Sequence, residues 1–433
     1  MKQSLSSSVL SQTEDTIRRY TLAMETEVNP SKKYEYSIVS CLRSLARQTK
    51  KSFETITKED IILFLNSFKK SEPLDPLHQS IGTYNLYSMY LIRFFRWLYS
   101  PDMTPGERPR PDCIRNIRQL KRKEKSIYKP SDMWSVDDDL LFLQHCPSKR
   151  VRCYHAIARD SSCRPHEILK LKIKDVVFKM VGDKQYAEIT VNGKTGQRHI
   201  PLIDSIPYLK DHLDDHPFRT NPNGPLICGE GKSLGRFVTV NTLERWYRVY
   251  KKEYFPRLLK DPQINPEIKN RIVDLLKKPW NPYIFRHSAL TTKSKILKES
   301  ILRQHAGWTP GSNMHLKYVH YFGNESTESI LEAYGLSPKS DRVDKLRPKA
   351  CPNCSEPNKI DSKFCAKCRM VLSYDAYTEA IDEKAQKESE VKTLAEKYDK
   401  DMKEMREQMN HIVSLIQENP KLANVKPEIL DKI

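Results

Sequence analysis

Two guanidinium groups and one phenol, far apart along the chain, have the chemistry needed to hold and attack a phosphodiester. Arg164 precedes Glu167 by one helical turn in the segment SCRPHEILKL, and a carboxylate at that spacing steadies a guanidinium that clamps a phosphate. Arg286 stands in YIFRHS and Tyr318 in HLKYVHY. A phenol with a pKa of about 10 is a weak nucleophile at neutral pH, but neighbouring guanidiniums favour its phenolate and neutralise the charge of the transition state.

Two more residues complete an ordered set. Lys194 lies in the Gly-Lys turn of NGKTGQ, and Trp308 follows the glycine of LRQHAGW. In the order Arg164, Lys194, Arg286, Trp308, Tyr318 the set resembles the catalytic domain of tyrosine recombinases, the phage-integrase and Xer-like DNA strand-exchange enzymes.

The resemblance, which covers roughly residues 15–335, implies a role for each member of the set. In the family the two arginines bind the scissile phosphate, the lysine protonates the leaving 5′ oxygen, and the indole N–H at the position of Trp308 donates to a non-bridging oxygen. Attack by Tyr318 then gives a covalent 3′-phosphotyrosyl link, which a 5′-hydroxyl of another strand reverses. Neither a metal ion nor ATP is needed for this chemistry.

Two positions depart from the commonest family pattern. Tyr283 stands where histidine is usual, as in a Tyr-x-x-Arg variant found among archaeal plasmid and virus integrases. It either hydrogen-bonds the phosphate or positions Arg286. Tyr318 comes ten residues after Trp308, one more than in the commonest members, and Tyr321 is the rival nucleophile.

Two histidines near these motifs have less defined roles. His287 either supports the phosphate or is structural, and His305 is expected to serve in packing alone.

Charge favours a nucleic acid as the partner. The 433 residues carry a net charge of +19, with a pI of about 9.3. Residues 373–433 hold 10 Lys and Arg against 14 Asp and Glu, a balance of −4, so residues 1–372 carry +23. Such a basic body binds a polyanion. The chain has no apolar run long enough to cross a membrane and no signal peptide, and six single cysteines do not form a disulfide framework, so we expect a cytoplasmic, nucleoid-associated protein without membrane contact.

Hydrophobic periodicity predicts a mainly α chain with a small antiparallel β-sheet. The strands are expected in VVFKM, QYAEITV and RHIPLI, with Asn192-Gly193 as a hairpin signal. The basic segment after Pro101 is either a solvated linker or a strap along the phosphate backbone. The predicted domains are a disordered N-terminus (1–13), a helical core-binding domain (14–100), a basic linker (101–131), a mixed α/β tyrosine-recombinase catalytic domain (132–335), a linker (336–349), a zinc ribbon (350–372) and a helical tail (373–433).

Four cysteines in two Cys-x-x-Cys pairs predict one structural Zn²⁺. Ten residues separate the pairs, and four thiolates give a closed tetrahedral site with no position for a substrate. The ligands are Cys351, Cys354, Cys365 and Cys368.

The tail has apolar residues at seven-residue spacing, at Val391, Tyr398, Met405 and Ile412. This pattern predicts an amphipathic helix that forms a coiled coil, lies back on the body or binds another protein.

These observations favour a site-specific tyrosine recombinase of the archaeal integrase type. Its expected partners are a double-stranded DNA attachment site and other copies of itself in a synaptic tetramer, and the ribbon and tail are candidates for contact with a further protein. The alternatives are a non-catalytic DNA-binding factor on the same scaffold and a type IB topoisomerase-like enzyme.

Overall fold

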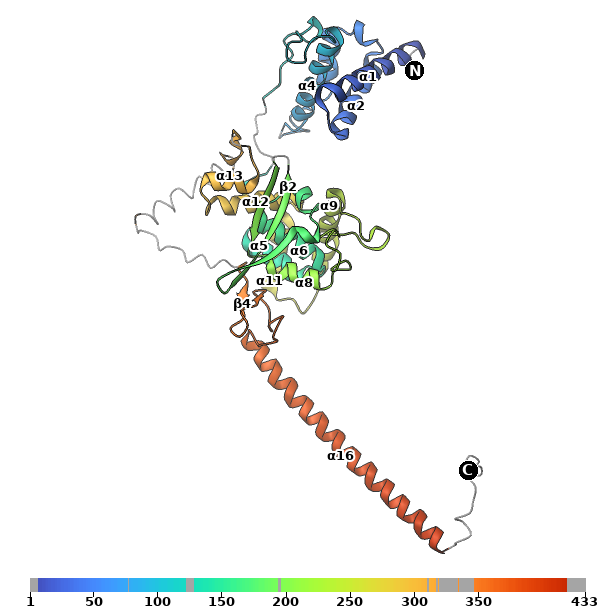
Figure 1. Ribbon diagram of the computed structural model, residues 1–433, viewed down its shortest axis with the longest axis vertical. Coiled ribbons are helices and arrows are strands. Elements are labelled where there is room, and N and C mark those ends of the chain that lie inside the picture. Colours follow the sequence, from blue (N-terminus) through green and yellow to red (C-terminus); the bar gives the residue numbers. More distant parts are fainter. Residues whose placement is uncertain are drawn as a thin grey trace. The chain divides into compact units, whose positions relative to one another are not determined.

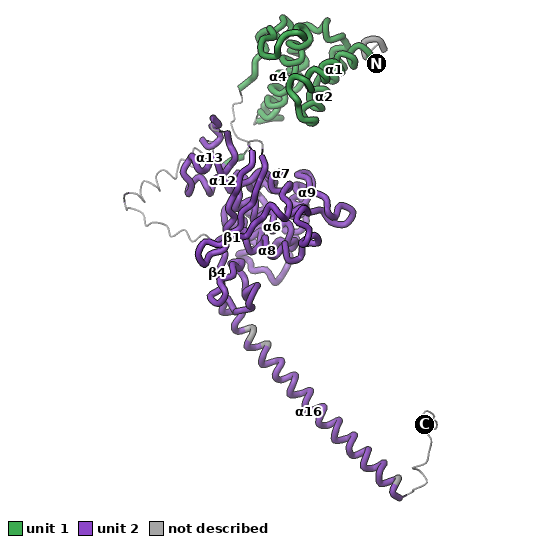
Figure 2. Tube along the Cα trace, viewed as in Figure 1, with its two compact units in different colours: residues 1–129 green, residues 130–433 purple. Residues whose placement is uncertain are grey.

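The computed structural model describes residues 7–76, 78–121, 128–193, 196–309, 311–316, 318, 334 and 346–418. The chain divides into two compact units, residues 1–129 and 130–433 (Figure 2). Helices dominate both units, and the few strands pair antiparallel (Figure 1). The predicted fold class, mainly α with a small antiparallel β-sheet, is confirmed.

The first unit is built around the aromatic ring of Phe94, which contacts Tyr20 and Phe53 at ring-centre distances of 5.1 and 4.7 Å. Side-chain caps fix two helix starts, Ser31 for α2 and Thr57 with Asp60 for α3. Its described helices are α1 (Ser7–Val28), α2 (Lys32–Thr49), α3 (Lys58–Asn66) and α4 (Ser80–Tyr99), with 3₁₀ turns η1 (Phe53–Thr55) and η2 (Asp112–Ile114).

Two predicted boundaries at this unit need correction. Helix α1 begins at residue 7, so disorder over 1–13 is wrong from residue 7 onward, and residues 1–6 lie outside the described part. The basic linker predicted from residue 101 begins later, because Ile114 and Ile117 are buried in the core of the first unit. Arg108 is buried as well and pairs with Glu27, so it is not free to follow a phosphate backbone. Residues 122–127 lie outside the described part.

The second unit begins with helices that bring distant segments into one core. Trp134 packs edge-on against Phe285 at 4.8 Å. Beside it, the carboxylate of Asp139 accepts hydrogen bonds from His155 at 2.9 Å and from Arg159. The helices and turns are η3 (Pro130–Asp132), α5 (Val136–His145), α6 (Lys149–Ser161), α7 (Pro165–Ile168), η4 (Ile173–Asp175), α8 (Ile206–Asp214), η5 (Gly231–Ser233), α9 (Val240–Val249), the π-turn η6 (Tyr250–Tyr254), α10 (Phe255–Leu258), α11 (Pro266–Lys277), α12 (Pro282–Ser294), α13 (Glu299–Ala306) and η7 (Asn313–His315).

The three-stranded sheet has the order β1 (Val176–Val181), β2 (Lys184–Gly193), β3 (Gly196–Leu202). Alternate residues of β2 are buried, as expected for a sheet with one face on a core. The hairpin between β2 and β3 is present, but the Asn-Gly pair is not its turn. Asn192 pairs with Gln197 and Gly193 with Gly196, so both residues end a strand.

A small module and a long helix follow the main body of the second unit. Strands β4 (Lys349–Ala350) and β5 (Pro357–Asn358) pair antiparallel in the module that holds the four clustered cysteines. Helix α16 (Tyr374–Glu418) then runs for 45 residues. No described helix is long and apolar enough to span a membrane.

Candidate active site and metal centre

A short helix after a left-handed turn places Arg164. Ser162 ends α6 with φ of +53°, and Arg164 is the N-cap of α7, with its backbone N–H donating to Glu167 Oε2 at 2.8 Å. The Arg164 guanidinium donates to Glu167 Oε1 at 3.0 Å and to the carbonyl of Gly307 at 3.4 Å. The predicted Arg-Glu pair is therefore real, and the carboxylate fixes both ends of the arginine.

Glu167 also holds a second arginine from the sheet. Arg198 on β3 donates to Glu167 Oε2 at 2.8 Å and to Oε1 at 3.3 Å. Burial by itself would raise the pKa of the Glu167 carboxyl, but the hydrogen bonds from Arg198 and Arg164 outweigh burial and lower that pKa to about 2. The carboxylate is thus charged at any working pH. The site residues inferred from the sequence do not include Arg198, although it follows Lys194 by four positions.

Two glycines leave room for this cluster. A Cβ on Gly193 would lie 2.5 Å from Glu167 Oε1, and one on Gly307 would lie 2.7 Å from Arg198 Nη1. Gly307 also has φ of +64°, the left-handed value that ends α13. Glycine is therefore required at both positions, because the end of β2 lies against Glu167 and the end of α13 lies against Arg198.

Helix α12 places the third guanidinium. Asn281 caps the helix by accepting from the N–H groups of residues 283 and 284. Arg286 is buried and donates to the carbonyls of Ser162 at 2.5 Å and Ala306 at 2.9 Å. Burial and, after it, the charge of Arg164 lower the pKa of Arg286 to about 10. Two carbonyls that hold a guanidinium leave its remaining N–H groups for an anion.

Tyr318 lies beside these guanidiniums. Its hydroxyl is 2.8 Å from His287 Nδ1, and its ring stacks on Trp308 with a centroid distance of 5.5 Å and an interplanar angle of 19°. Burial raises the pKa of Tyr318 to about 12, although the charges of Arg286 and Arg164 act in the opposite direction. The phenol is therefore neutral at rest, with a hydrogen-bond partner able to take its proton.

The structure brings together four of the six predicted catalytic residues: Arg164, Arg286, Trp308 and Tyr318. Tyr283, one helical turn before Arg286, is 40% exposed. Lys194, between β2 and β3, lies outside the described residues, as does the rival Tyr321.

Among the histidines, His287 has a position that the sequence left open, directly against the Tyr318 hydroxyl. The adjacency of Arg286 and His287 in the sequence was a signal for it. His305 is half-buried, and burial lowers its pKa to about 3, which fits the packing role expected for it.

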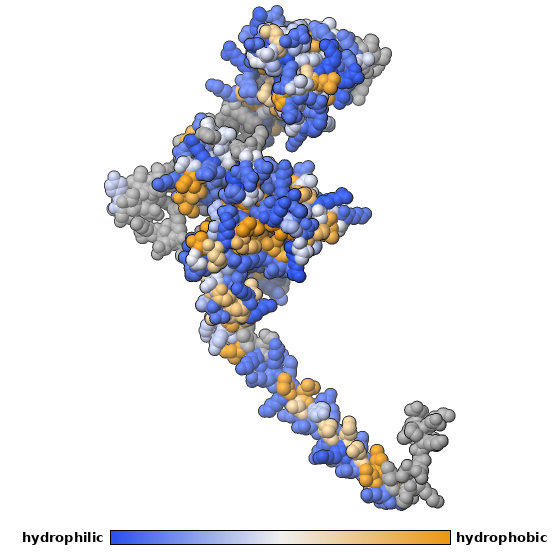
Figure 3. Space-filling model, in the orientation of Figure 1, coloured by the Kyte–Doolittle hydropathy of each residue, from blue (hydrophilic) through white to orange (hydrophobic). Residues whose placement is uncertain are grey.

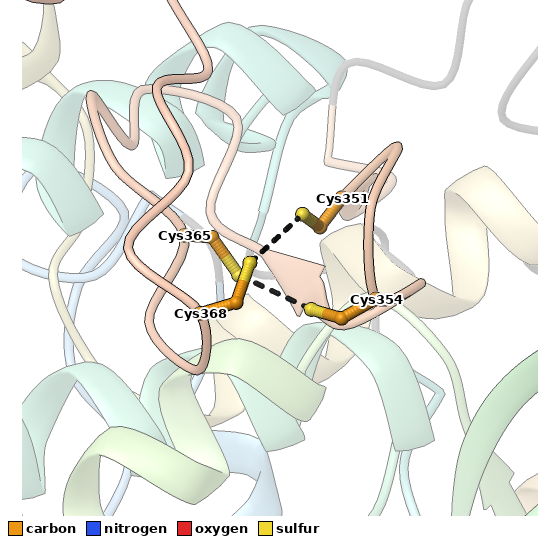
Figure 4. A group of neighbouring side chains, drawn as sticks. All are labelled: Cys351, Cys354, Cys365 and Cys368. Atoms are coloured by element: carbon orange, nitrogen blue, oxygen red, sulfur yellow. Dashed lines mark hydrogen bonds between the residues drawn. The ribbon is translucent and has the colours of Figure 1, made fainter.

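The four clustered cysteines converge from two loops (Figure 4). The Sγ atoms of Cys351 and Cys368 are 3.6 Å apart, as are those of Cys354 and Cys365, and all four lie within 4.8 Å of one another. A tetrahedral zinc with Zn–S bonds of about 2.3 Å separates its sulfurs by about 3.8 Å, so this set fits one metal ion.

The cysteine module docks on helix α8 of the same unit. Lys359 pairs with Asp211 at 2.6 Å and lies over the ring of Tyr208, while Glu356 pairs with Lys210. Lys359 and Glu356 belong to a loop of the cysteine module, so these contacts with α8 form only when the module is folded.

Comparison with known proteins gives structural overlaps only. No protein-family model and no curated protein matches the chain. Among solved structures, a lambda integrase dimer bound to a COC′ core site shares 15% identity over 70% of this chain and 76% of that one, with a TM-score of 0.47. XerH bound to a palindromic difH substrate shares 15% over 77% and 100%, also at 0.47. The Tn1549 transposon integrase in complex with transposon right end DNA shares 12% over 74% and 99%, at 0.48.

Proposed function

We propose that this protein is a site-specific tyrosine recombinase of the integrase type, which cuts and rejoins DNA through a 3′-phosphotyrosyl intermediate. One observation carries the proposal: the buried hydroxyl of Tyr318 is hydrogen-bonded to His287 next to two guanidiniums held by buried acceptors. A phenol needs such surroundings to attack a phosphate, whereas a structural tyrosine does not.

The arginines bind the phosphate in this mechanism. Arg286 is anchored by two carbonyls and Arg164 by Glu167, so neither must be reorganised when charge develops on the phosphorus oxygens. Trp308, stacked on Tyr318, donates its indole N–H to a non-bridging oxygen. Loss of one such donor costs on the order of 10²–10³ in rate.

His287 is the general base in this proposal. As the Tyr318 oxygen bonds to phosphorus, Nδ1 accepts the phenolic proton, so no free phenolate has to exist at neutral pH. The bond from phosphorus to the 5′ oxygen breaks, and Lys194 supplies the proton for that leaving oxygen. Tyr283 stands at the position of the usual histidine, where it hydrogen-bonds the phosphate or positions Arg286.

The DNA partner is a double-stranded attachment site, which the basic body of the protein binds. Four copies of the chain form a synaptic tetramer that exchanges the DNA strands. The outcome is integration or excision of a mobile element. The zinc ion is structural and has no step in strand transfer, because four thiolates close its coordination sphere.

Covalent trapping on DNA of random sequence tests the proposal, because it does not require a defined attachment site. The full chain is incubated with a library of nicked random duplexes, and SDS-resistant adducts are isolated and mapped by mass spectrometry. We expect the DNA on Tyr318. Tyr318→Phe should keep DNA binding and lose the adduct, and Tyr321→Phe should keep both.

Four other outcomes would overturn parts of the proposal. An adduct on Tyr321 refutes the assigned nucleophile. DNA binding with no adduct at any sequence supports the non-catalytic factor, and relaxation of supercoiled plasmid without recombination supports the topoisomerase-like enzyme. An adduct rate that is unchanged in His287→Ala removes the histidine from the mechanism while leaving the enzyme class intact.

A further inference from the structure

Helix α16 carries an apolar stripe that no described part of the chain covers. Its members alternate at spacings of four and three residues, the a and d positions of a heptad repeat. Figure 3 shows apolar patches along the helix, and the exposed fractions of Tyr398 and Met409 are both 65%. We call this stripe the tail seam: Val391, Ala395, Tyr398, Met402, Met405, Met409 and Ile412.

Among the described residues, the seam packs against no other element of its own unit. Beyond Ala376, every described side chain of α16 is exposed except the half-buried Ser414. A single helix is only marginally stable in water, and proteins rarely leave a long apolar stripe uncovered. The seam therefore has a partner helix, and the residues that flank it indicate which one.

A parallel pair of α16 helices gives poor contacts beside the seam. In that arrangement each g residue of one helix meets the e residue five positions later on the other. Leu394 would meet Asp399, and Gln408 would meet Val413, so apolar side chains face polar ones. Only Asp401 with Arg406 is complementary.

An antiparallel pair centred between Lys403 and Glu404 matches the same residues. Leu394 of one copy then meets Leu415 of the other. Asp399 meets Arg406, and twofold symmetry makes each contact twice. The stem of Lys392 covers Val413. The seam layers would pair Ala395 with Ile412, Tyr398 with Met409, and Met402 with Met405.

We propose that α16 forms an antiparallel coiled coil with α16 of a second copy of this chain. At about 1.5 Å per residue, each helix runs about 44 Å from Tyr374 to the centre of the pair, which separates the two cysteine modules by about 90 Å. Such a tether joins copies that occupy separate DNA sites rather than neighbours on one site. The pairing does not depend on the proposed strand exchange.

Cross-linking of the full chain distinguishes the two orientations. Two differently tagged variants, Ala395→Cys and Ile412→Cys, are treated with a short bismaleimide singly and as a mixture, with the unsubstituted chain as background. The antiparallel pair gives a cross-linked species that carries both tags, only in the mixture. Cross-links within each single variant would show a parallel pair and refute the proposal, as would no cross-link together with a monomer in sedimentation.

Charge exchange gives a second, independent readout. Arg406→Glu should weaken self-association about tenfold, because it places like charges together twice. Adding Asp399→Arg in the same chain should restore it. Rescue by Asp401→Arg instead would indicate the parallel pair. If none of the three substitutions changed self-association, α16 would not mediate it, and the proposed pairing of two α16 helices would be refuted.

Discussion

Replacement of Glu167 by glutamine should remove a large, pH-dependent contribution to the stability of the second unit. The Glu167 carboxylate is fully buried and accepts hydrogen bonds from Arg164 and Arg198, and glutamine keeps its size but not its charge. Two guanidiniums would then share a site without a counter-charge, and breaking a buried ion pair on one side is costly.

The magnitude follows from the pKa of the carboxyl. A decrease from 4.5 to about 2 corresponds to about 3 kcal/mol of stability. Because the folded-state pKa is the lower one, this contribution is fully present above pH 4.5 and is lost as the pH falls towards 2. Glu167→Gln should therefore lower the free energy of unfolding by about 3 kcal/mol at pH 7, and by much less near pH 3.

Tryptophan fluorescence during urea unfolding measures this change. Four of the five tryptophans lie in residues 130–433, so the signal reports mainly on the second unit. Glu230→Gln is the matched control, because Glu230 pairs with Arg150 but its side chain is 74% exposed, and it should cost under about 1 kcal/mol. If both variants lost the same stability at pH 7, Glu167 would not be the clamp inferred from its contacts.

Three shorter predictions concern the surroundings of this cluster. Gly307→Ala should slow adduct formation at least tenfold by displacing Arg198, whereas Gly182→Ala, with a similar φ of +59° and open space, should cost about 1 kcal/mol of stability and no activity. Removal of the metal should release about one zinc per chain. It should also expose the cysteine module to protease, because the contact of Lys359 with Asp211 is lost, while the yield of the DNA adduct is unchanged. Adduct formation that required added metal would contradict the mechanism. Burial favours the neutral imidazole of His305, so protonating it between pH 6.5 and 3 destabilises the fold. His305→Leu should therefore reduce the loss of stability on acidification over that range. An unchanged acid transition would show that protonation of His305 does not cost stability.

Local relations are what the sequence predicted well. The Arg164–Glu167 pair, the three strands and the four-cysteine cluster depend on spacings of a few residues, which backbone geometry converts directly into contacts. Two local sequence signals gave wrong predictions, because tertiary packing outweighed them. The Asn192-Gly193 pair ends a strand, since ladder pairing continues to Gly196. Apolar residues after Pro101 joined the core of the first unit although the segment is basic.

The sequence by itself determined which reactive side chains the protein contains and the local helices and strands on which they lie. Only the tertiary structure decided that Arg198 shares the carboxylate of Glu167 across 31 positions, and that His287 meets the hydroxyl of Tyr318 across another 31. Such contacts arise when separate helices and strands bury their apolar faces together. No periodicity within one element encodes them, because their partners are chosen by the packing of the whole unit.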